Sequence, residues 1–184
     1  MTDNHDEGAK VGDEEQFCRD EAVIPAPPER VWEVLGDLGT WGEWWNLVSV
    51  VPLGPTLLAP GVRFRFEGQR PGRPPTGWTV EVLEMDAPRR IEFAYVDGDL
   101  IGRTAWELEP VEGGTRAAYV YRGVHATSPG SGETFARYGT RLHSVAMQVD
   151  ALAGLARFVR REPLDADWRA DIRARMDAGV AALE

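Results

Sequence analysis

Apolar and charged residues alternate through the middle of the chain, from residue 49 to residue 123. A period of two residues is that of a β-strand, in which successive side chains point to opposite faces of a sheet. Short segments rich in glycine and proline interrupt the alternation, and such short connections join antiparallel neighbours. The middle of the chain is therefore predicted to form an antiparallel meander. The most regular segments are residues 62–67, 78–82, 91–95, 104–108 and 116–122.

The alternation gives the predicted sheet two unlike faces. One face carries arginine and glutamate side chains of mixed sign, which suits contact with water and cross-strand ion pairs. The other face is apolar and largely aromatic, so another element must cover it. Its members are Phe64, Phe66, Trp78, Val80, Val82, Ile91, Phe93, Tyr95, Thr104, Trp106, Leu108, Tyr119 and Tyr121.

Helical spacing of apolar residues follows the predicted sheet. Residues 133–161 are predicted to form one long helix with a single apolar stripe, which is the only partner large enough to cover the aromatic face. The stripe consists of side chains that fall on one line at about 100° per residue. These are Tyr138, Leu142, Val145, Val149, Leu152 and Ala156.

Shorter elements complete the expected domain. Residues 16–24 end in an apolar run typical of a first strand, and prolines then precede a short helical pattern. Residues 1–15 are acidic and lack periodicity, so they are predicted to be a disordered tail. The folded domain is expected to span residues 16–162, and residues 163–184 are predicted to form a second amphipathic helix.

Charge and cysteine content narrow the function classes. The 184 residues carry a net charge of −10, which argues against a nucleic-acid or anionic-membrane surface. No apolar run approaches the roughly 20 residues that span a bilayer, and the N-terminus lacks the pattern of a secretory signal. The single cysteine, Cys18, excludes an internal disulfide and favours a reducing compartment. We expect a cytoplasmic protein without nucleic-acid or membrane partners, and a homodimer is left open.

Trp41, Trp44 and Trp45 lie within five residues of one another, in a segment with few charges. Three indoles this close in sequence cannot all point into a small core from one face of a single helix. Two interpretations remain open: the indoles line or plug the mouth of a pocket, or they form the core at one end of the domain.

Two stretches resemble a known superfamily. Residues 24–46, IPAPPERVWEVLGDLGTWGEWWN, are similar to the opening of the SRPBCC or START-like superfamily, particularly its polyketide cyclase/dehydratase-like members. Residues 106–123, WELEPVEGGTRAAYVYRG, resemble the last hairpin of the same families. The resemblance implies an α+β helix-grip fold, in which about seven curved antiparallel strands wrap one long C-terminal helix. Two short helices would close one end of a deep cavity between sheet and helix.

The resemblance also implies a chemistry for this cavity. Cyclases of this kind fold a reactive poly-β-ketone, and hydroxyl groups with an arginine polarise its carbonyls for aldol closure and dehydration. The catalytic candidates in this chain are Tyr119, Tyr121 and Arg141, although Arg141 has the alternative of a solvated helix charge. The predicted ligand-binding residues are Trp45, Phe64, Phe66, Trp78, Phe93, Tyr95, Trp106, Leu142, Val145 and Gln148.

Nucleophilic and metal chemistry have little support in the sequence. Cys18 has no histidine near it in the chain, and the three histidines are too widely spaced to suggest a metal site. His143 is predicted to face solvent, and His125 is interpreted as a surface-loop residue. No cofactor and no metal are expected.

Three functions are consistent with these patterns. The first is a polyketide cyclase/aromatase or dehydratase acting on a planar oxygenated molecule. The second is a non-catalytic binder or carrier of a hydrophobic or aromatic small molecule. The third is a protein-interaction module like the chaperone activators of the same fold, for which Trp168 and Ile172 on the last helix would be the contact residues.

Overall fold

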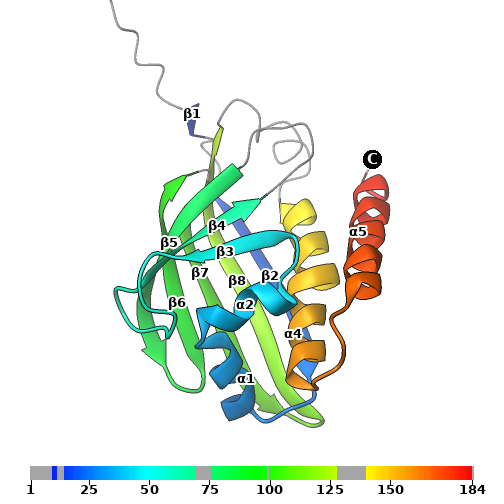
Figure 1. Cartoon of the computed structure of the whole chain (residues 1–184). Helices are drawn as coiled ribbons and strands as arrows, with labels where there is room; N and C mark the ends of the chain where they lie inside the picture. The colour runs from blue at the N-terminus through cyan, green and yellow to red at the C-terminus, as the bar shows by residue number, and fades with distance from the viewer. Residues whose placement is uncertain (1–9, 12–14, 69–75, 99, 128–139, 184) are drawn as a thin grey trace, which may run out of the picture.

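The computed structural model describes residues 10–11, 15–68, 76–98, 100–127 and 140–183 (Figure 1). Seven antiparallel strands form one curved sheet in the spatial order β2-β8-β7-β6-β5-β4-β3, and the two-residue strand β1 (Lys10–Val11) pairs with the end of β8. Every strand from β3 to β8 pairs with its neighbours in sequence, which confirms the predicted meander. The strands are β2 (Gln16–Ile24), β3 (Val48–Pro52), β4 (Arg63–Gly68), β5 (Thr76–Asp86), β6 (Arg90–Gly98), β7 (Leu100–Val111) and β8 (Gly114–Thr127).

Helices cover the concave face of this sheet. Helices α1 (Pro28–Leu35) and α2 (Leu38–Trp44) close one end, as predicted. A longer helix over residues 140–159 runs along the sheet; it contains a π-helical segment, η1 (Met147–Ala151), and ends as α4 (Leu152–Val159). The predicted helix start at residue 133 lies outside the described residues. The arrangement confirms the α+β helix-grip fold.

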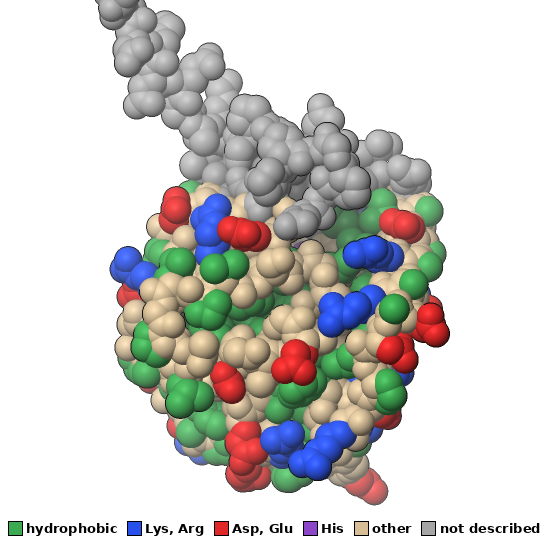
Figure 2. Space-filling model, viewed as in Figure 1, with side chains coloured by type: hydrophobic (Ala, Val, Ile, Leu, Met, Phe, Trp, Pro, Cys, Tyr) green, Lys and Arg blue, Asp and Glu red, His purple; other side chains and the backbone are tan. Residues whose placement is uncertain are grey.

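The convex face of the sheet is the charged one. Ion pairs join neighbouring strands across it: Arg63 to Glu81, Arg103 to Glu92 and Arg90 to Glu107. Such exposed pairs contribute at most about 1 kcal/mol each to stability. On the face drawn in Figure 2, the described acidic and basic side chains are interspersed and do not gather by sign. None of the helices described is both long enough and apolar enough to cross a bilayer.

The last helix, α5 (Ala166–Ala181), packs on the outer side of the long helix (Figure 1). Ile172 is fully buried, and the guanidinium of Arg157 lies 4.4 Å from the ring centroid of Trp168. A Cβ atom at Gly179 would meet the side chain of Val145, so the two helices approach closely there. The apolar side of α5 is therefore turned toward the domain.

A buried carboxylate ties the end of α2 to the long helix. Asp150 is completely buried within the π-helical segment. Its Oδ1 accepts hydrogen bonds from the backbone N and Nδ2 of Asn46, each at 3.0 Å. Its Oδ2 accepts from the backbone N of Asn46 at 2.9 Å and of Leu47 at 2.7 Å. Burial raises the pKa of Asp150, and these hydrogen bonds oppose that rise.

Replacing Asp150 with asparagine tests this tie. An amide presents NH2 on one side, and in either orientation that NH2 would face a backbone donor instead of accepting from it. We expect Asp150→Asn to lower the free energy of unfolding by about 1–3 kcal/mol in urea denaturation. Asp97→Asn is the control, because that side chain is 74% exposed; equal losses in both variants would contradict the role of Asp150.

A second contact fixes the distance between α2 and α4. A Cβ atom at Gly154 would collide with the backbone carbonyl of Trp44, whereas nothing lies within 4 Å of a Cβ at Gly42 in α2. We therefore expect replacement by alanine to change the free energy of unfolding in opposite directions at these two positions. Gly154→Ala should destabilise the protein by about 1–3 kcal/mol, and Gly42→Ala should stabilise it by about 0.4–1 kcal/mol. Thermal unfolding of both variants measures this, and a stabilising Gly154→Ala would show that α4 does not rest on Trp44.

Candidate functional site

The three tryptophans fill the concave side of the sheet. Trp41 and Trp44 are 1% and 0% exposed, and Trp45 is 8% exposed. The Trp41 ring packs edge-on against Phe64 with centroids 5.5 Å apart, and Trp45 lies 5.0 Å from Phe66. Trp41 Nε1 also donates a hydrogen bond to the carbonyl of Leu35 at 3.1 Å. Of the two interpretations of this stretch, the structure supports the one in which the indoles are core.

Little space remains where these rings meet the sheet. The void there amounts to about 160 Å³ of space between atoms, and it has no room for a water molecule. A planar ligand of drug-like size needs about 300 Å³ or more. Within the part of the chain that the structure describes, binding at this place therefore requires side chains to move. The lining residues are Trp41, Phe64, Phe66, Val80, Phe93, Thr104 and Tyr119.

Most of the predicted ligand-binding residues lie in or beside this aromatic cluster. The buried ones are Trp45, Phe64, Phe66, Phe93, Tyr95, Trp106 and Leu142. Trp78 and Val145 are half-buried, and Gln148 is exposed and donates a hydrogen bond to the Glu21 carbonyl at 3.4 Å. Arg141 is also exposed, which agrees with its alternative as a solvated helix charge. The binding and catalytic roles of all these residues stay predictions.

Two tyrosine hydroxyl groups meet inside the cluster. Oη of Tyr95 on β6 lies 2.9 Å from Oη of Tyr119 on β8, and Thr104 lies on β7 between them. Burial raises the pKa of Tyr119 to about 12, and it raises the pKa of Tyr95 well above 10. Both phenols therefore keep their protons at neutral pH. Because one hydroxyl donates to the other, the accepting hydroxyl still has a proton to offer to a third group.

His143 lies beside these phenols, although the sequence predicted that it faces solvent. Its ring stacks on Tyr119 and Tyr121, with centroids 5.6 and 5.9 Å away, and its side chain is only 18% exposed. The prediction was wrong because it counted 100° per residue along an unbroken α-helix. The π-helical turn, closed by the Leu152 N–H bond to the Met147 carbonyl, holds about one extra residue and shifts the two halves by about 100°.

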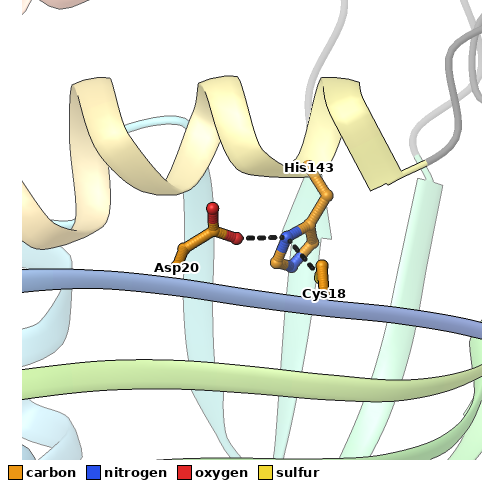
Figure 3. A group of neighbouring side chains, drawn as sticks. All are labelled: Cys18, Asp20 and His143. Atoms are coloured by element: carbon orange, nitrogen blue, oxygen red, sulfur yellow. Dashed lines mark hydrogen bonds and ion pairs between the residues drawn. The ribbon is translucent and has the colours of Figure 1, made fainter.

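The same histidine contacts two residues of β2 (Figure 3). Its Nδ1 lies 3.3 Å from Sγ of Cys18 and 3.3 Å from Oδ2 of Asp20. Cys18 and Asp20 are two residues apart on one strand, so both point inward, and they are 6% and 5% exposed. No histidine lies near Cys18 in the sequence, because its partner is 125 residues away. An aspartate on the inward face of the first strand was the signal that could have indicated this cluster.

Burial, reinforced by the charge of Asp20, raises the pKa of the Cys18 thiol from 9.0 to about 12. A hydrogen bond from the backbone of Tyr121 acts in the opposite direction. The folded protein therefore holds the thiol proton over a pH range in which the unfolded chain loses it. The contribution of this proton to the free energy of unfolding is fully present below pH 9, and it is lost as the pH rises from 9 toward 12.

We expect this loss to be visible in urea unfolding in metal-free buffer. The free energy of unfolding of the wild type should fall more steeply between pH 9 and pH 10 than that of Cys18→Ala. Any loss that comes from the buried tyrosines is shared by both proteins and cancels in the comparison. Parallel pH dependences would show that burial does not hold the Cys18 proton.

Comparison with known proteins identifies the family. Residues 18–184 match the profile of a family described as polyketide cyclase / dehydrase and lipid transport. The chain belongs to this family. No curated protein sequence matches it significantly.

Solved structures share the fold of this family member. TTHA0849 from Thermus thermophilus is 25% identical with a TM-score of 0.65, over 79% of this chain and 98% of that one. The Zhui aromatase/cyclase from Streptomyces sp. R1128 is 16% identical with a TM-score of 0.63, over 80% and 95% of the two chains. Ara h 8.0201 is 13% identical with a TM-score of 0.57, over 81% and 100%.

Proposed function

We propose that the protein binds a planar, oxygenated hydrophobic molecule beside the Tyr95–Tyr119 pair and promotes its aldol cyclisation or dehydration. The single observation that carries this proposal is the pair of buried, neutral hydroxyl groups 2.9 Å apart among aromatic rings. The family description, which names polyketide cyclases and dehydrases, supports the same reaction class. So does the likeness of fold to an aromatase/cyclase.

The phenol pair suits stabilisation of a developing enolate. The free proton of the pair would be donated to a substrate carbonyl oxygen, and that hydrogen bond strengthens as negative charge grows on the oxygen. Because the pKa of Tyr119 is raised to about 12, the phenol donates without giving up its proton. Hydrogen bonding to Thr104 opposes the rise in the pKa of both phenols. The Thr104 hydroxyl donates its own proton to the Val120 carbonyl at 2.8 Å, so it can only accept from the pair, and the substrate carbonyl would take its place as acceptor. Tyr121 stays a candidate, and we assign no step to the exposed Arg141.

Binding at this place is coupled to opening of the tryptophan cluster. Trp45 is the most exposed of the three indoles at 8%, and its ring lies 6.0 Å from that of Tyr119. A ligand that reaches the Tyr119 hydroxyl would displace the Trp45 ring and take over its contacts. The displacement costs free energy, which reduces the observed affinity. Once bound, the ligand excludes water from the reacting groups.

A non-catalytic carrier is the second candidate. The packed interior favours it, because a site that opens only for ligand and whose buried phenols stay neutral fits storage of a hydrophobic molecule. The family description also names lipid transport. The interaction-module alternative has less support, because Ile172 is buried and Trp168 packs under Arg157.

The product distribution from a synthase-generated poly-β-ketone separates the enzyme from the carrier. We expect the wild type to shift that distribution away from spontaneous cyclisation. Tyr119→Phe or Tyr95→Phe should reduce the rate of this shift by ~10-fold or more, which corresponds to ~1.4 kcal/mol of barrier, with a small change in ligand affinity.

Thr115→Val is the matched control. It also removes a buried hydroxyl, one that donates to the Ala26 carbonyl at 2.7 Å, outside the aromatic cluster. We expect it to change stability and leave the products unaltered. If the wild type gives the spontaneous distribution, the enzyme proposal fails; tryptophan quenching by aromatic polyphenols would then support the carrier.

A further inference from the structure

Cys18, Asp20 and His143 form a buried cluster. In it, one ring nitrogen of His143 faces two possible hydrogen-bond partners. Sγ of Cys18, Oδ2 of Asp20 and a ring nitrogen of His143 all lie within 4.8 Å of one another. Both the sulfur and the carboxylate oxygen approach the same nitrogen, Nδ1, at 3.3 Å (Figure 3). One N–H can donate well to one of them only. Among the described residues, Asp20 Oδ2 has no hydrogen-bond partner of acceptable geometry, although it is buried.

We propose that Cys18, Asp20 and His143 bind a divalent transition-metal ion of the zinc type. Tetrahedral coordination at about 2.0–2.3 Å places neighbouring ligand atoms about 3.3–3.6 Å apart. The two 3.3 Å separations at Nδ1 match that spacing, so small side-chain rotations bring all three atoms to one ion. A site with three protein ligands leaves the fourth position open to water or another molecule.

The ligand types fit this class of ion. A thiolate and an imidazole are ligands that zinc and cobalt prefer, and neither suits magnesium or calcium. With a thiolate and a carboxylate, the site has a charge of −2, which neutralises a divalent cation in a buried place. The ion also removes the unsatisfied acceptor at Asp20, because the carboxylate oxygen then binds the metal.

The scaffold holds the three ligands in place before an ion arrives. Cys18 and Asp20 pair in register with Tyr121 and Tyr119 on β8, so the strand backbone fixes their spacing. The His143 ring is held by stacking on those same two tyrosines. Ligands positioned by packed elements lose little conformational freedom when they bind.

A cysteine–histidine–aspartate triad is the competing interpretation of this cluster. In a triad the histidine contacts the nucleophile through one ring nitrogen and the carboxylate through the other. Here the thiol and the carboxylate lie at the same nitrogen, so a proton cannot pass from one to the other through the ring. Three potential ligand atoms gathered at one place are instead what binding of a shared ion requires.

This inference does not depend on the proposed function, because it rests on residues other than the Tyr95–Tyr119 hydroxyl pair. The two are neighbours, since the His143 ring lies against Tyr119. A failure of the metal test therefore leaves the phenol chemistry in place, and Tyr119→Phe should still bind metal.

Cobalt titration of the metal-free full-length protein tests the proposal. We expect one equivalent of Co²⁺ to give a sulfur-to-cobalt charge-transfer band and the intense visible bands of four-coordinate cobalt, and Zn²⁺ to displace it. Since Cys18 is the only cysteine, the charge-transfer band reports on this residue alone. Bound Zn²⁺ should also slow the reaction of Cys18 with a thiol reagent.

Single substitutions identify the ligands. Cys18→Ser should abolish the charge-transfer band, and Asp20→Asn and His143→Gln should each weaken Zn²⁺ binding by ~10-fold or more in competition with a chromophoric chelator. Asp97→Asn, at an exposed carboxylate, should bind as the wild type does. Absence of the band from the folded wild type, or equal Zn²⁺ affinity in the wild type and Asp20→Asn, would overturn the proposal. Circular dichroism verifies folding, and the wild-type spectrum decides the matter if a variant does not fold.

Discussion

The carboxylate of Asp150 determines how the inner side of this protein is filled. It accepts hydrogen bonds from the backbone N–H groups that follow α2, and so it holds that end of α2 against the long helix. Since Trp41, Trp44 and Trp45 sit on or next to α2, the same hydrogen bonds direct three indoles into the concave face of the sheet. The close approach of Gly154 to the Trp44 carbonyl sets the separation at which this happens. The aromatic core thus depends on one buried carboxyl group whose cost of burial is offset by hydrogen bonds from three N–H groups.

Filling the concave face with protein has consequences for any ligand. The indoles pack beside the phenol pair, so among the described residues a molecule that enters from the tryptophan side has to break at least one aromatic contact. If a conformation with that contact broken is a minor state of the free protein, its population reduces the apparent affinity in proportion. Selectivity follows as well, because a ligand must replace aromatic contacts with equally good ones.

Much of the fold could be predicted from the sequence. The period-two segments identified the strands, and the inward positions Phe64, Phe93 and Tyr119 are indeed buried. The charged residues in between form cross-strand ion pairs on the outer face, as their alternation indicated. Local patterns succeeded here because strand periodicity and short turns are determined by neighbouring residues.

The candidate site was less accessible to this reasoning, because it depends on contacts between distant residues. Nothing near Cys18 in sequence indicates His143, and the face on which His143 lies depends on a π-helical turn that begins four residues later. The role of the tryptophans could not be decided either, since it depends on how far α2 sinks toward the sheet. Asp150 was not identified as a core residue, because a lone aspartate in a helix is usually a surface group.

The π-helical segment divides the long helix into two parts with separate packing tasks. The part before it presents His143 to β2 and to the tyrosine rings, and the part after it presents Leu152, Leu155 and Gly154 to the core and α2. In a regular α-helix the same face would have to pack against both neighbours, so the orientations of the two halves would depend on each other. The wider turn removes that dependence, so each half can follow its own neighbour. Within a family that shares one fold, such a π-helical turn allows the residues at one end of the molecule to change while the packing at the other end is retained.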